Sequence, residues 1–204
     1  MPKDKGASHA RIVPAAKKEF LEKGYEKASM RSIAEAAGMT SAGLYRHFED
    51  KEAMFAALVE PLLEKLQGLY TEVERQDYEY LNAGDMDSMW ERGMELTIFL
   101  PVIYDNWEEF KLLICCSTGT RYEHFIHDLV MIEQEKTLEY LEAAREKGVA
   151  VKQIEEKELH LLLSAYATAL FEVVVHDFTR EEAVHYMKTI GEFFYPGWRA
   201  VLGL

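Results

Sequence analysis

The segment at residues 29–51, SMRSIAEAAGMTSAGLYRHFEDK, constrains the fold more than any other part of this chain. Its first half places apolar residues at the spacing of one helical face, and Ser29 stands before them as a good N-cap residue. The residues expected to face inward are Met30, Ile33, Ala34 and Ala37. Gly38 is expected to end this helix, because glycine adopts a positive φ without a steric penalty.

A second short helix is predicted after a three-residue turn. Thr40 can cap it, and Leu44 is its expected buried residue. The helix should extend from Ser41 to about His47, although Gly43 inside it weakens it by about 1 kcal/mol relative to alanine. Two such helices crossing over a tight turn form a helix-turn-helix. On the local pattern alone, an ordinary helix pair of an all-α protein remains open as the alternative.

The flanking sequence from Ile12 to Phe55 carries further motifs. The most specific are Ala-Ala-x-x-x-Phe at 15–20, Gly24-Tyr25, Ile-Ala-x-x-Ala-Gly at 33–38 and Leu-Tyr-x-His-Phe-x-x-Lys at 44–51. With these motifs the chain resembles the tetracycline-repressor (TetR) family of bacterial transcription regulators. Pro14 departs from the family pattern, whose first helix is usually uninterrupted, so we expect this helix to begin near Val13 with Pro14 as its first helical residue.

The resemblance implies an all-α fold with an N-terminal three-helix helix-turn-helix DNA-binding domain and a larger helical effector-binding and dimerisation domain. It implies a flexible polar tail at 1–7, a DNA-binding domain at 8–50 with its motif at 29–48, and the larger domain at 51–204. The implied function is that of a homodimeric transcriptional regulator, not an enzyme and without a cofactor. A small organic effector would release this repressor from a near-palindromic operator on double-stranded DNA.

Two alternatives come from other functional classes. One is an all-α ligand carrier or enzyme with a vestigial helix-turn-helix, which would lack salt-sensitive DNA binding. The other is a nucleoid-type protein that holds DNA without any effector, and its stability would not change with a ligand.

The resemblance also implies which side chains contact DNA. The side chains expected in the major groove are Arg31, Thr40, Ser41 and Ala42, and those expected to hold the phosphate backbone are Tyr45, His47 and Lys51. The positive end of a helix dipole, a phenol, an imidazole and an ammonium all suit phosphate oxygens.

Net charge divides unevenly along the chain. The whole chain carries −13, yet residues 1–51 hold 10 Lys and Arg against 7 Asp and Glu. The remainder holds 13 Lys and Arg against 29 Asp and Glu. A positive end on an acidic body orients a molecule on a polyanion, so the division supports DNA binding by the N-terminal part.

Composition favours a helical protein of the cytoplasm. The chain of 204 residues is 49% hydrophobic with only 5 prolines, and Ala, Leu, Glu and Lys dominate it. No stretch approaches the roughly 20 uncharged residues of a membrane span, so no membrane partner is expected. The N-terminus lacks an apolar signal core.

The rest of the chain is predicted to be a series of helices. The expected segments are 51–80 with a kink at Pro61, 86–103, 105–116, 121–147, 154–177 and 179–201, the last interrupted near Pro196-Gly197. The helix at 159–175 is apolar over most of its circumference, so it must be covered on all sides. A second subunit would cover it, and the alternative is a central helix wrapped by its own chain.

Aromatic residues of the larger domain are the candidate lining of an effector pocket. They are Trp90, Phe99, Tyr104, Trp107, Phe110, Tyr122, Phe125 and Tyr166. The alternative is that they form plain core. The polar residues Glu95, Arg121, His124 and Glu172 either orient a ligand or face water, and the acidic surroundings favour a neutral or cationic effector over an anion.

A metal site is one interpretation of four residues that fall close together in the sequence, Cys115, Cys116, His124 and His127. Adjacent cysteines point in different directions on a helix, and zinc ligands are typically two to four residues apart. We therefore expect no metal and no Cys–His nucleophile.

Overall fold

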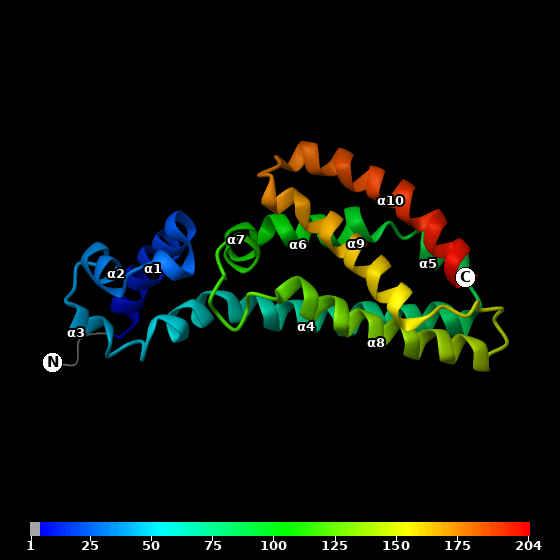
Figure 1. Cartoon of the computed structure of the whole chain (residues 1–204), viewed down its shortest axis with the longest axis horizontal. Coiled ribbons are helices and arrows are strands. Elements are labelled where there is room, and N and C mark those ends of the chain that lie inside the picture. Colours follow the sequence, from blue (N-terminus) through cyan, green and yellow to red (C-terminus); the bar gives the residue numbers. More distant parts are fainter. Residues whose placement is uncertain (1–4) are drawn as a thin grey trace. The chain divides into compact units, whose positions relative to one another are not determined.

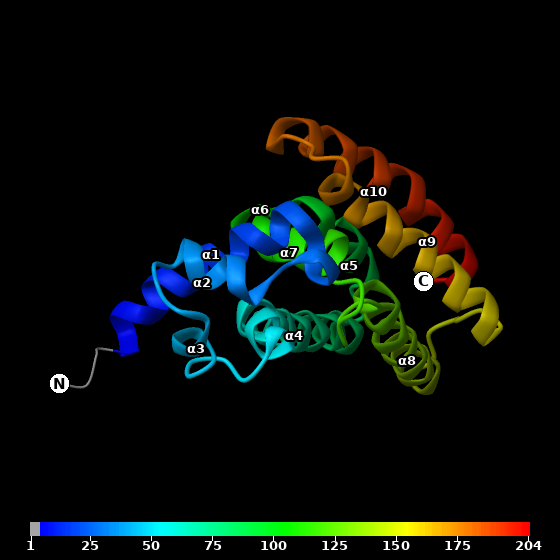
Figure 2. The same ribbon diagram turned by 60° about the vertical axis from the view of Figure 1, so that its left-hand side comes forward.

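The computed structural model describes residues 5–204, and every regular element in that range is a helix (Figures 1 and 2). The elements are α1 (Lys5–Lys27), α2 (Met30–Ala36), α3 (Ser41–Leu44), α4 (Lys51–Ala83), α5 (Met86–Glu91), the π-helix η1 (Glu95–Phe99), α6 (Leu100–Asp105), α7 (Trp107–Cys115), α8 (Phe125–Glu146), α9 (Glu156–Val175) and α10 (Arg180–Leu202). The predicted all-α class is confirmed. Of the expected polar tail, residues 1–4 lie outside the described residues and residues 5–7 belong to α1.

The chain folds into two compact units. Unit 1 comprises the residues up to Leu66 together with Asn106–Glu123, and unit 2 comprises Gln67–Asp105 and His124–Leu204. Helix α4 therefore contributes its first half to unit 1 and its second half to unit 2. Helix α7 belongs to unit 1, although α6 and α8 on either side of it in the sequence belong to unit 2. The compact units thus differ from the predicted domain boundary at residue 50.

In unit 1, α1 packs against α2 and α7, and it contacts α4 through an aromatic ring pair. The rings of Phe20 and Phe55 form the edge-to-face contact between α1 and α4, 5.2 Å apart, and both side chains are fully buried. Pro14 lies inside α1, so the prediction that this helix begins near Val13 is wrong. A proline removes only one helical hydrogen bond, and buried residues on both sides of it hold α1 in place.

Helix α1 breaks sharply at Gly24, where φ is 72° and ψ is 164°. This region of backbone space is essentially restricted to glycine. Directly after the break, the Tyr25 N–H donates a hydrogen bond of 2.8 Å to the carbonyl of Cys116 at the end of α7. The break therefore brings the end of α1 onto the end of α7.

In unit 2, α9 packs against α8 and α10, and η1 packs against α6 and α10. A core cluster between α8, α9 and α10 consists of Val130, Leu141, Leu159, Leu163, Ala167, Trp198 and Leu202. The segment predicted as one helix at 86–103 is instead α5, η1 and α6, with a left-handed glycine, Gly93, after α5. Conversely, α10 continues through Pro196 and Gly197 without the predicted interruption.

Helix α9 is long and apolar enough to span a membrane by length and composition, and 39% of its most apolar window is buried. No other helix in residues 5–204 meets that test. Its apolar surface is partly explained by packing, because α8 and α10 both lie against it (Figure 1). The part that remains exposed needs a separate explanation.

Two glycine substitutions should change stability in opposite directions. Gly24→Ala should lower the free energy of unfolding by about 1–3 kcal/mol, because alanine cannot adopt the backbone angles at the break without strain. Gly68→Ala, inside α4, should raise stability by up to about 1 kcal/mol, since a Cβ there meets no atom within 4 Å. Thermal unfolding of the two variants checks both, and an unchanged melting temperature for Gly24→Ala would contradict the described break.

Candidate nucleic-acid interface and interior polar site

The predicted helix-turn-helix is present as α2, a turn and α3. Gly38 has the expected left-handed backbone, with a φ of 67°. Thr40 caps α3, because its Oγ1 accepts a hydrogen bond of 3.1 Å from the N–H of Gly43. Leu44 is fully buried and anchors α3. The geometry of the turn therefore follows from the residue types that predicted it.

Two details of the motif differ from the prediction. Ser29 precedes α2 but makes no side-chain cap bond, and its backbone N–H instead donates to Oε1 of Glu19 at 3.1 Å. Helix α3 ends at Leu44 rather than near His47. The N–H groups of His47 and Phe48 both donate to the carbonyl of Leu44, which closes the chain into a turn there.

Six of the seven predicted DNA-contact residues are accessible on this motif. Arg31, Thr40, Ala42 and Tyr45 are exposed, and Ser41 and His47 are partly buried. Tyr45 is one of the large side chains left exposed, at 52%. The motif thus presents to solvent a guanidinium, two hydroxyls, a phenol and an imidazole, which are groups that bind phosphates and base edges.

Lys51, the seventh, is engaged within the protein. Its Nζ donates to the carbonyl oxygens of Tyr25, Glu26 and Ala28 at 2.7, 3.1 and 3.2 Å, and it lies 4.3 Å from the centroid of the Tyr25 ring. An ammonium has three protons, so these bonds use all of them. In this structure the Lys51 side chain closes the end of α1, and its role as a phosphate contact stays a prediction.

Two cations near the motif were not predicted. Arg46 directly follows Tyr45 and is exposed. Arg11 of α1 reaches the turn, because a Cβ added to Gly38 would lie 3.6 Å from its Nη1. Arg46 could have been found from its place within the motif, whereas the position of Arg11 depends on the packing of α1 against α2. Both add positive charge to the surface around the turn.

Helix α7 is held in unit 1 by ion pairs as well as by the Tyr25 hydrogen bond. Nζ of Lys17 lies 2.6 Å from Oε1 of Glu109 and 3.0 Å from Oε2 of Glu108. Burial alone would lower the pKa of Lys17, but the hydrogen bonds to the two glutamates raise it. Lys17 is therefore a charged link between α1 and the first turn of α7.

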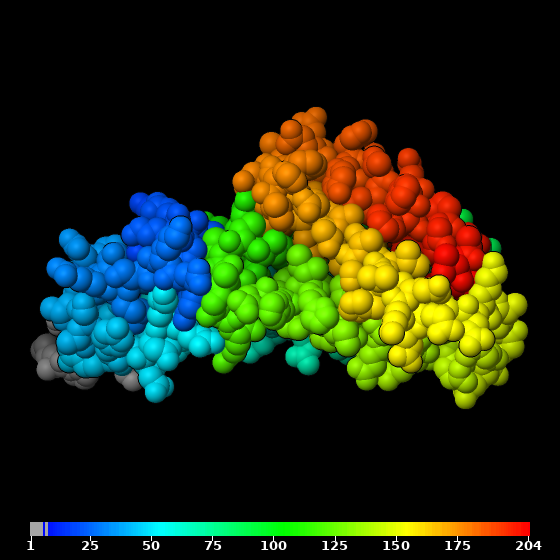
Figure 3. Space-filling model, viewed as in Figure 1, coloured from blue at the N-terminus to red at the C-terminus, as the bar shows by residue number. Residues whose placement is uncertain are grey.

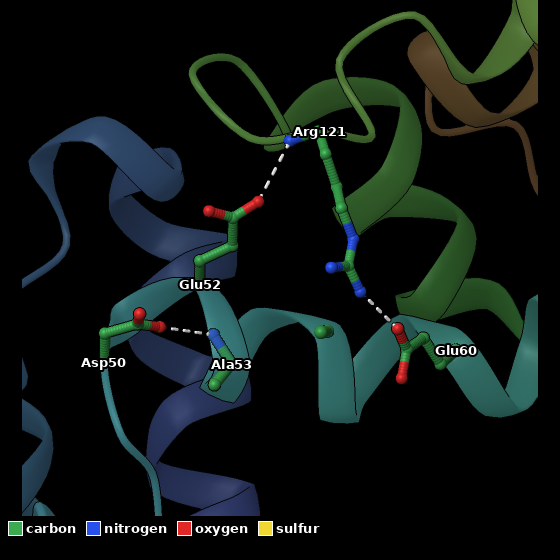
Figure 4. Close-up of a pocket in the computed structure, with 6 residues that line it drawn as sticks. Asp50, Glu52, Ala53, Glu60 and Arg121 are labelled. Carbon is green, nitrogen blue, oxygen red and sulfur yellow. Dashed lines mark hydrogen bonds and ion pairs between the residues drawn. The ribbon is translucent and has the colours of Figure 1, made fainter.

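The loop after α7 is also bonded within unit 1, beside an open pocket of about 350 Å³. Figure 4 shows the Arg121 side chain reaching Glu60, while its backbone N–H faces Glu52 at 3.4 Å. Asp50 accepts a hydrogen bond of 2.7 Å from the N–H of Ala53. The polar groups of this pocket bind one another and its lining is largely acidic. It is therefore not the aromatic effector pocket that was predicted.

The eight aromatic residues predicted to line one effector pocket divide between the units. Trp107, Phe110 and Tyr122 belong to unit 1, and Trp90, Phe99, Tyr104, Phe125 and Tyr166 belong to unit 2. The first three therefore do not share a compact unit with the others, contrary to the expected convergence in one larger domain. A pocket lined by the five residues of unit 2 stays a prediction.

Glu95, the first residue of η1, is a buried carboxylate of unit 2 and only 2% exposed. Its Oε1 accepts a hydrogen bond of 2.7 Å from the hydroxyl of Tyr166, and its Oε2 accepts one from the hydroxyl of Tyr195. The Tyr195 oxygen in turn accepts the N–H of Met94 at 3.2 Å. Both tyrosines are far from Glu95 in the sequence, so linear spacing could not have paired them with it.

The pKa values of both tyrosine hydroxyls are strongly raised. Burial, together with the charge of Glu95, raises the pKa of Tyr166 well above its ordinary value of 10.0. Burial and the hydrogen bond to Glu95 raise the pKa of Tyr195 as well. Both hydroxyls therefore stay protonated and keep donating to the carboxylate throughout the neutral range.

These shifts predict an alkaline loss of stability. Above pH 10 the tyrosines ionise in the unfolded chain but not in the folded one, so the free energy of unfolding should fall as pH rises beyond that value. Tyr195→Phe removes one of the groups, so its decline should be shallower than that of the parent protein. Urea unfolding followed by circular dichroism between pH 8 and pH 11 measures both slopes. Equal slopes would contradict the burial of this hydroxyl.

The cysteines and histidines that were candidates for a metal site do not form a metal-binding cluster in the described residues. Cys115 is exposed and Cys116 is buried, where burial raises the pKa of its thiol. The His127 ring instead lies 5.7 Å from the ring of His160 on α9. Within residues 5–204, no three His, Cys, Asp or Glu side chains are grouped so as to hold a metal ion.

Known proteins match both the motif and the fold. Residues 12–58 match the model of the bacterial regulatory proteins of the tetR family. The HTH-type transcriptional repressor Rv1474c of Mycobacterium tuberculosis is 37% identical over 60 residues, which are 29% of this chain and 32% of that protein. The chain thus matches about a third of the length of this curated relative.

Solved structures extend the likeness to nearly the whole chain. NalD, the secondary repressor of the MexAB-OprM multidrug efflux pump in Pseudomonas aeruginosa, is similar with a TM-score of 0.55 and 20% identity, over 92% of this chain and 95% of that one. The TetR-family regulator PfmR of Thermus thermophilus is similar with a TM-score of 0.55 and 21% identity, over 89% and 92%. At such identities these structures show the fold alone. The family match over residues 12–58, taken with the helix-turn-helix described above, supports a TetR family transcriptional regulator.

Proposed function

We propose that this protein is a transcriptional repressor that binds a near-palindromic DNA operator as a homodimer and leaves it when unit 2 takes up a small organic effector. The single observation that carries this proposal is the capped α2–turn–α3 motif with its accessible Arg31, Ser41 and Tyr45. A motif of this kind places the start of its second helix at base edges, while the flanking polar groups hold the backbone. The alternatives, an enzyme or carrier with an inert motif and an effector-free DNA protein, gain no support from a specific contact.

The direct test of the proposal is selection of genomic DNA fragments by the purified protein. A repressor should enrich a small set of fragments that share an inverted repeat, with half-site centres about one helical turn or slightly more apart. Enrichment without a shared sequence would favour the nucleoid-type alternative. No enrichment at low salt would favour the enzyme or carrier.

Substitution of single cationic side chains should distinguish those that contact DNA from those that stabilise the fold. Arg46→Ala should lower the slope of log affinity against log salt by about one unit, because one phosphate contact is lost. Lys51→Met should leave that slope unchanged and instead lower the melting temperature, since it removes hydrogen bonds from a charged donor worth about 1.5–3 kcal/mol each. Fluorescence anisotropy at several salt concentrations and a thermal melt measure the two quantities. A normal melting temperature for Lys51→Met together with a reduced slope would restore this lysine as a DNA contact.

The proposed dimer is supported by apolar side chains left exposed on α9 and α10. In unit 2 these two helices lie side by side, α9 from yellow to orange and α10 from orange to red in Figure 3. The exposed large apolar residues on them are Leu161 (68%), Leu162 (38%), Val175 (45%), Phe193 (74%) and Val201 (38%). Exposed apolar patches of this kind mark interaction surfaces, and a second copy of the chain would cover them.

A charge placed in this surface should separate the subunits. Leu161→Asp combined with Phe193→Asp should give a monomer on multi-angle light scattering and abolish operator binding, because each subunit alone reads only one half-site. Met131→Asp, at a 47% exposed apolar position of α8, is the matched control and should remain dimeric. A dimeric double variant would refute the assignment of this surface.

The connection between effector and operator would run through the segments that pass between the units. The chain crosses from one unit to the other inside α4 after Leu66, and again on either side of α7 at Asn106 and Glu123. Pro61 lies within α4 and removes one of its backbone hydrogen bonds, which makes bending easier there. An effector can shift operator affinity only by its differential affinity for the two dimer states, typically about 1–3 kcal/mol.

A further inference from the structure

The carboxylate of Glu95 lacks a cationic partner. Burying a charged carboxylate is costly unless it is paired and hydrogen-bonded, and two neutral hydroxyls from Tyr166 and Tyr195 offset that cost only in part. No Lys, Arg or His side chain of residues 5–204 forms an ion pair with it. Arg92 is only three positions earlier in the sequence, but its Nη2 is paired with Oδ1 of Asp77 at 2.5 Å. Within the described residues, the negative charge of Glu95 is therefore not neutralised by an ion pair.

Hydrogen-bonding capacity of the carboxylate is also left over. A carboxylate has about four acceptor positions, and the two tyrosines use one on each oxygen of Glu95. If the residue served only to join η1 to α9 and α10, a glutamine would make comparable bonds without the cost of a buried charge. The charge therefore calls for a role that the packing alone does not supply.

Further aromatic rings lie against the two tyrosines that bind the carboxylate. Tyr166 lies 5.1 Å from the ring of Phe194 and 6.3 Å from that of Trp198, and Tyr195 lies 5.9 Å from that of Trp90. The faces of such rings attract cations, most strongly where water is excluded. Together with one carboxylate, they make an environment suited to an amine on an apolar or aromatic body.

Two buried side-chain nitrogens of unit 2, Nε1 of Trp90 and Nε of Arg92, are without a hydrogen-bond partner among the described residues. Nε1 of Trp90 is buried and donates no hydrogen bond to any described residue. Buried polar groups are nearly always paired, so an orphaned donor indicates a missing partner. The ring of Trp90 contacts Tyr195, one of the two hydroxyl donors to Glu95. An acceptor atom on the same ligand would satisfy the indole.

A second carboxylate makes this interior unfavourable for an anion. Glu133 of α8 accepts a hydrogen bond of 2.7 Å from the hydroxyl of Tyr70. Burial raises the pKa of Glu133, and its charge acts on Tyr166 together with that of Glu95. An effector with a carboxylate or a phosphate would meet like charge here.

The backbone at Glu95 is itself unusual. Glu95 opens a π-helix, and short π-helical segments are frequent at functional sites. The same segment leads through α6 to Asn106, where the chain enters unit 1. A ligand that binds Glu95 therefore acts on a segment whose continuation folds with the helix-turn-helix.

We propose that Glu95 anchors an organic cation, a protonated or quaternary amine on an apolar body, as the effector of this protein. The proposal rests on the function proposed above and gives the chemical class of its effector. The ammonium takes an acceptor position of the Glu95 carboxylate that the two tyrosines leave unused, and the rings around Tyr166 and Trp90 enclose its apolar part.

The test compares ligands that differ in charge but not in shape. Isothermal titration calorimetry of the full-length protein at neutral pH would use 4-phenylbutylamine, 4-phenylbutanol and 4-phenylbutyrate, with benzyltrimethylammonium as a cation that cannot donate a hydrogen bond. The amine should bind the parent protein about tenfold or more tightly than the alcohol, and the carboxylate should not bind. Glu95→Gln keeps the size and hydrogen bonding of the side chain. It should weaken binding of the amine by about thirtyfold or more and leave the affinity for the alcohol unchanged.

Glu133→Gln is the matched control, because it makes the same change at a second, partly buried carboxylate of unit 2 that also accepts a hydrogen bond from a tyrosine. It should retain the preference for the amine. Equal affinities for amine and alcohol, an unchanged amine affinity in Glu95→Gln, an equal loss in both glutamine variants, or no binding of either cation would overturn the proposal. Circular dichroism and a thermal melt of Glu95→Gln confirm that the variant is folded, and Tyr195→Phe provides a second change at the same carboxylate that should alter amine affinity.

Operator binding is measured separately, so that the two proposals can fail independently. If the amine binds through Glu95 and weakens binding of the selected DNA fragment, both stand. If it binds through Glu95 without affecting DNA, the cation site stands, and its role as the effector site fails. If the protein selects no DNA fragment, the repressor function fails, whatever the calorimetry shows.

Discussion

The ammonium of Lys51 holds the end of α1 in place, and the arrangement of unit 1 depends on this contact. The last carbonyl groups of a helix have no helical donors, and a lysine near them supplies both protons and charge. Lys51 is the first residue of α4, so its bonds to Tyr25, Glu26 and Ala28 join the beginning of one long helix to the end of another. The N–H of Tyr25 at the same bend reaches α7. Three helices thus meet at one polar junction, and α2 and α3 lie between two of them in the sequence.

Local interactions explain why the motif could be predicted. Gly38, Thr40 and Leu44 act within a few residues of their own positions: one adopts a left-handed backbone, one caps a helix and one is buried beneath it. Residue type and spacing are enough to specify such roles. The helices around them were also placed correctly in outline, because an amphipathic repeat depends only on neighbouring turns. The boundaries failed where proline was overestimated, since Pro14 and Pro196 are both accommodated inside continuous helices.

Contacts between distant segments explain what could not be predicted. The partners of Glu95 come from positions 71 and 100 residues further along the chain, and no periodicity connects them. The resemblance predicts that Lys51 contacts DNA, but in this structure its ammonium donates hydrogen bonds to the carbonyl groups of the bend around Tyr25. The aromatic residues at 107–122 were grouped with an effector pocket because they are aromatic and follow α6. Contacts between distant residues hold α7 in unit 1, among them the ion pairs of Lys17 with two glutamates about ninety positions away and the hydrogen bond from Tyr25 to Cys116.

The discontinuity of unit 1 has a consequence for how such a protein can diversify. The recognisable family segment ends at residue 58, yet the folded body that contains it also needs Asn106–Glu123 from the middle of the chain. A gene fusion made at the end of that segment would join it to a foreign helix in place of α7. The amide of Tyr25 would then lose the carbonyl it binds, and Lys17 would lose both carboxylates. The two halves of this protein cannot be exchanged as contiguous cassettes. An exchange of the family segment would have to carry Asn106–Glu123 with it, so that α7 keeps the surface of α1 that it binds.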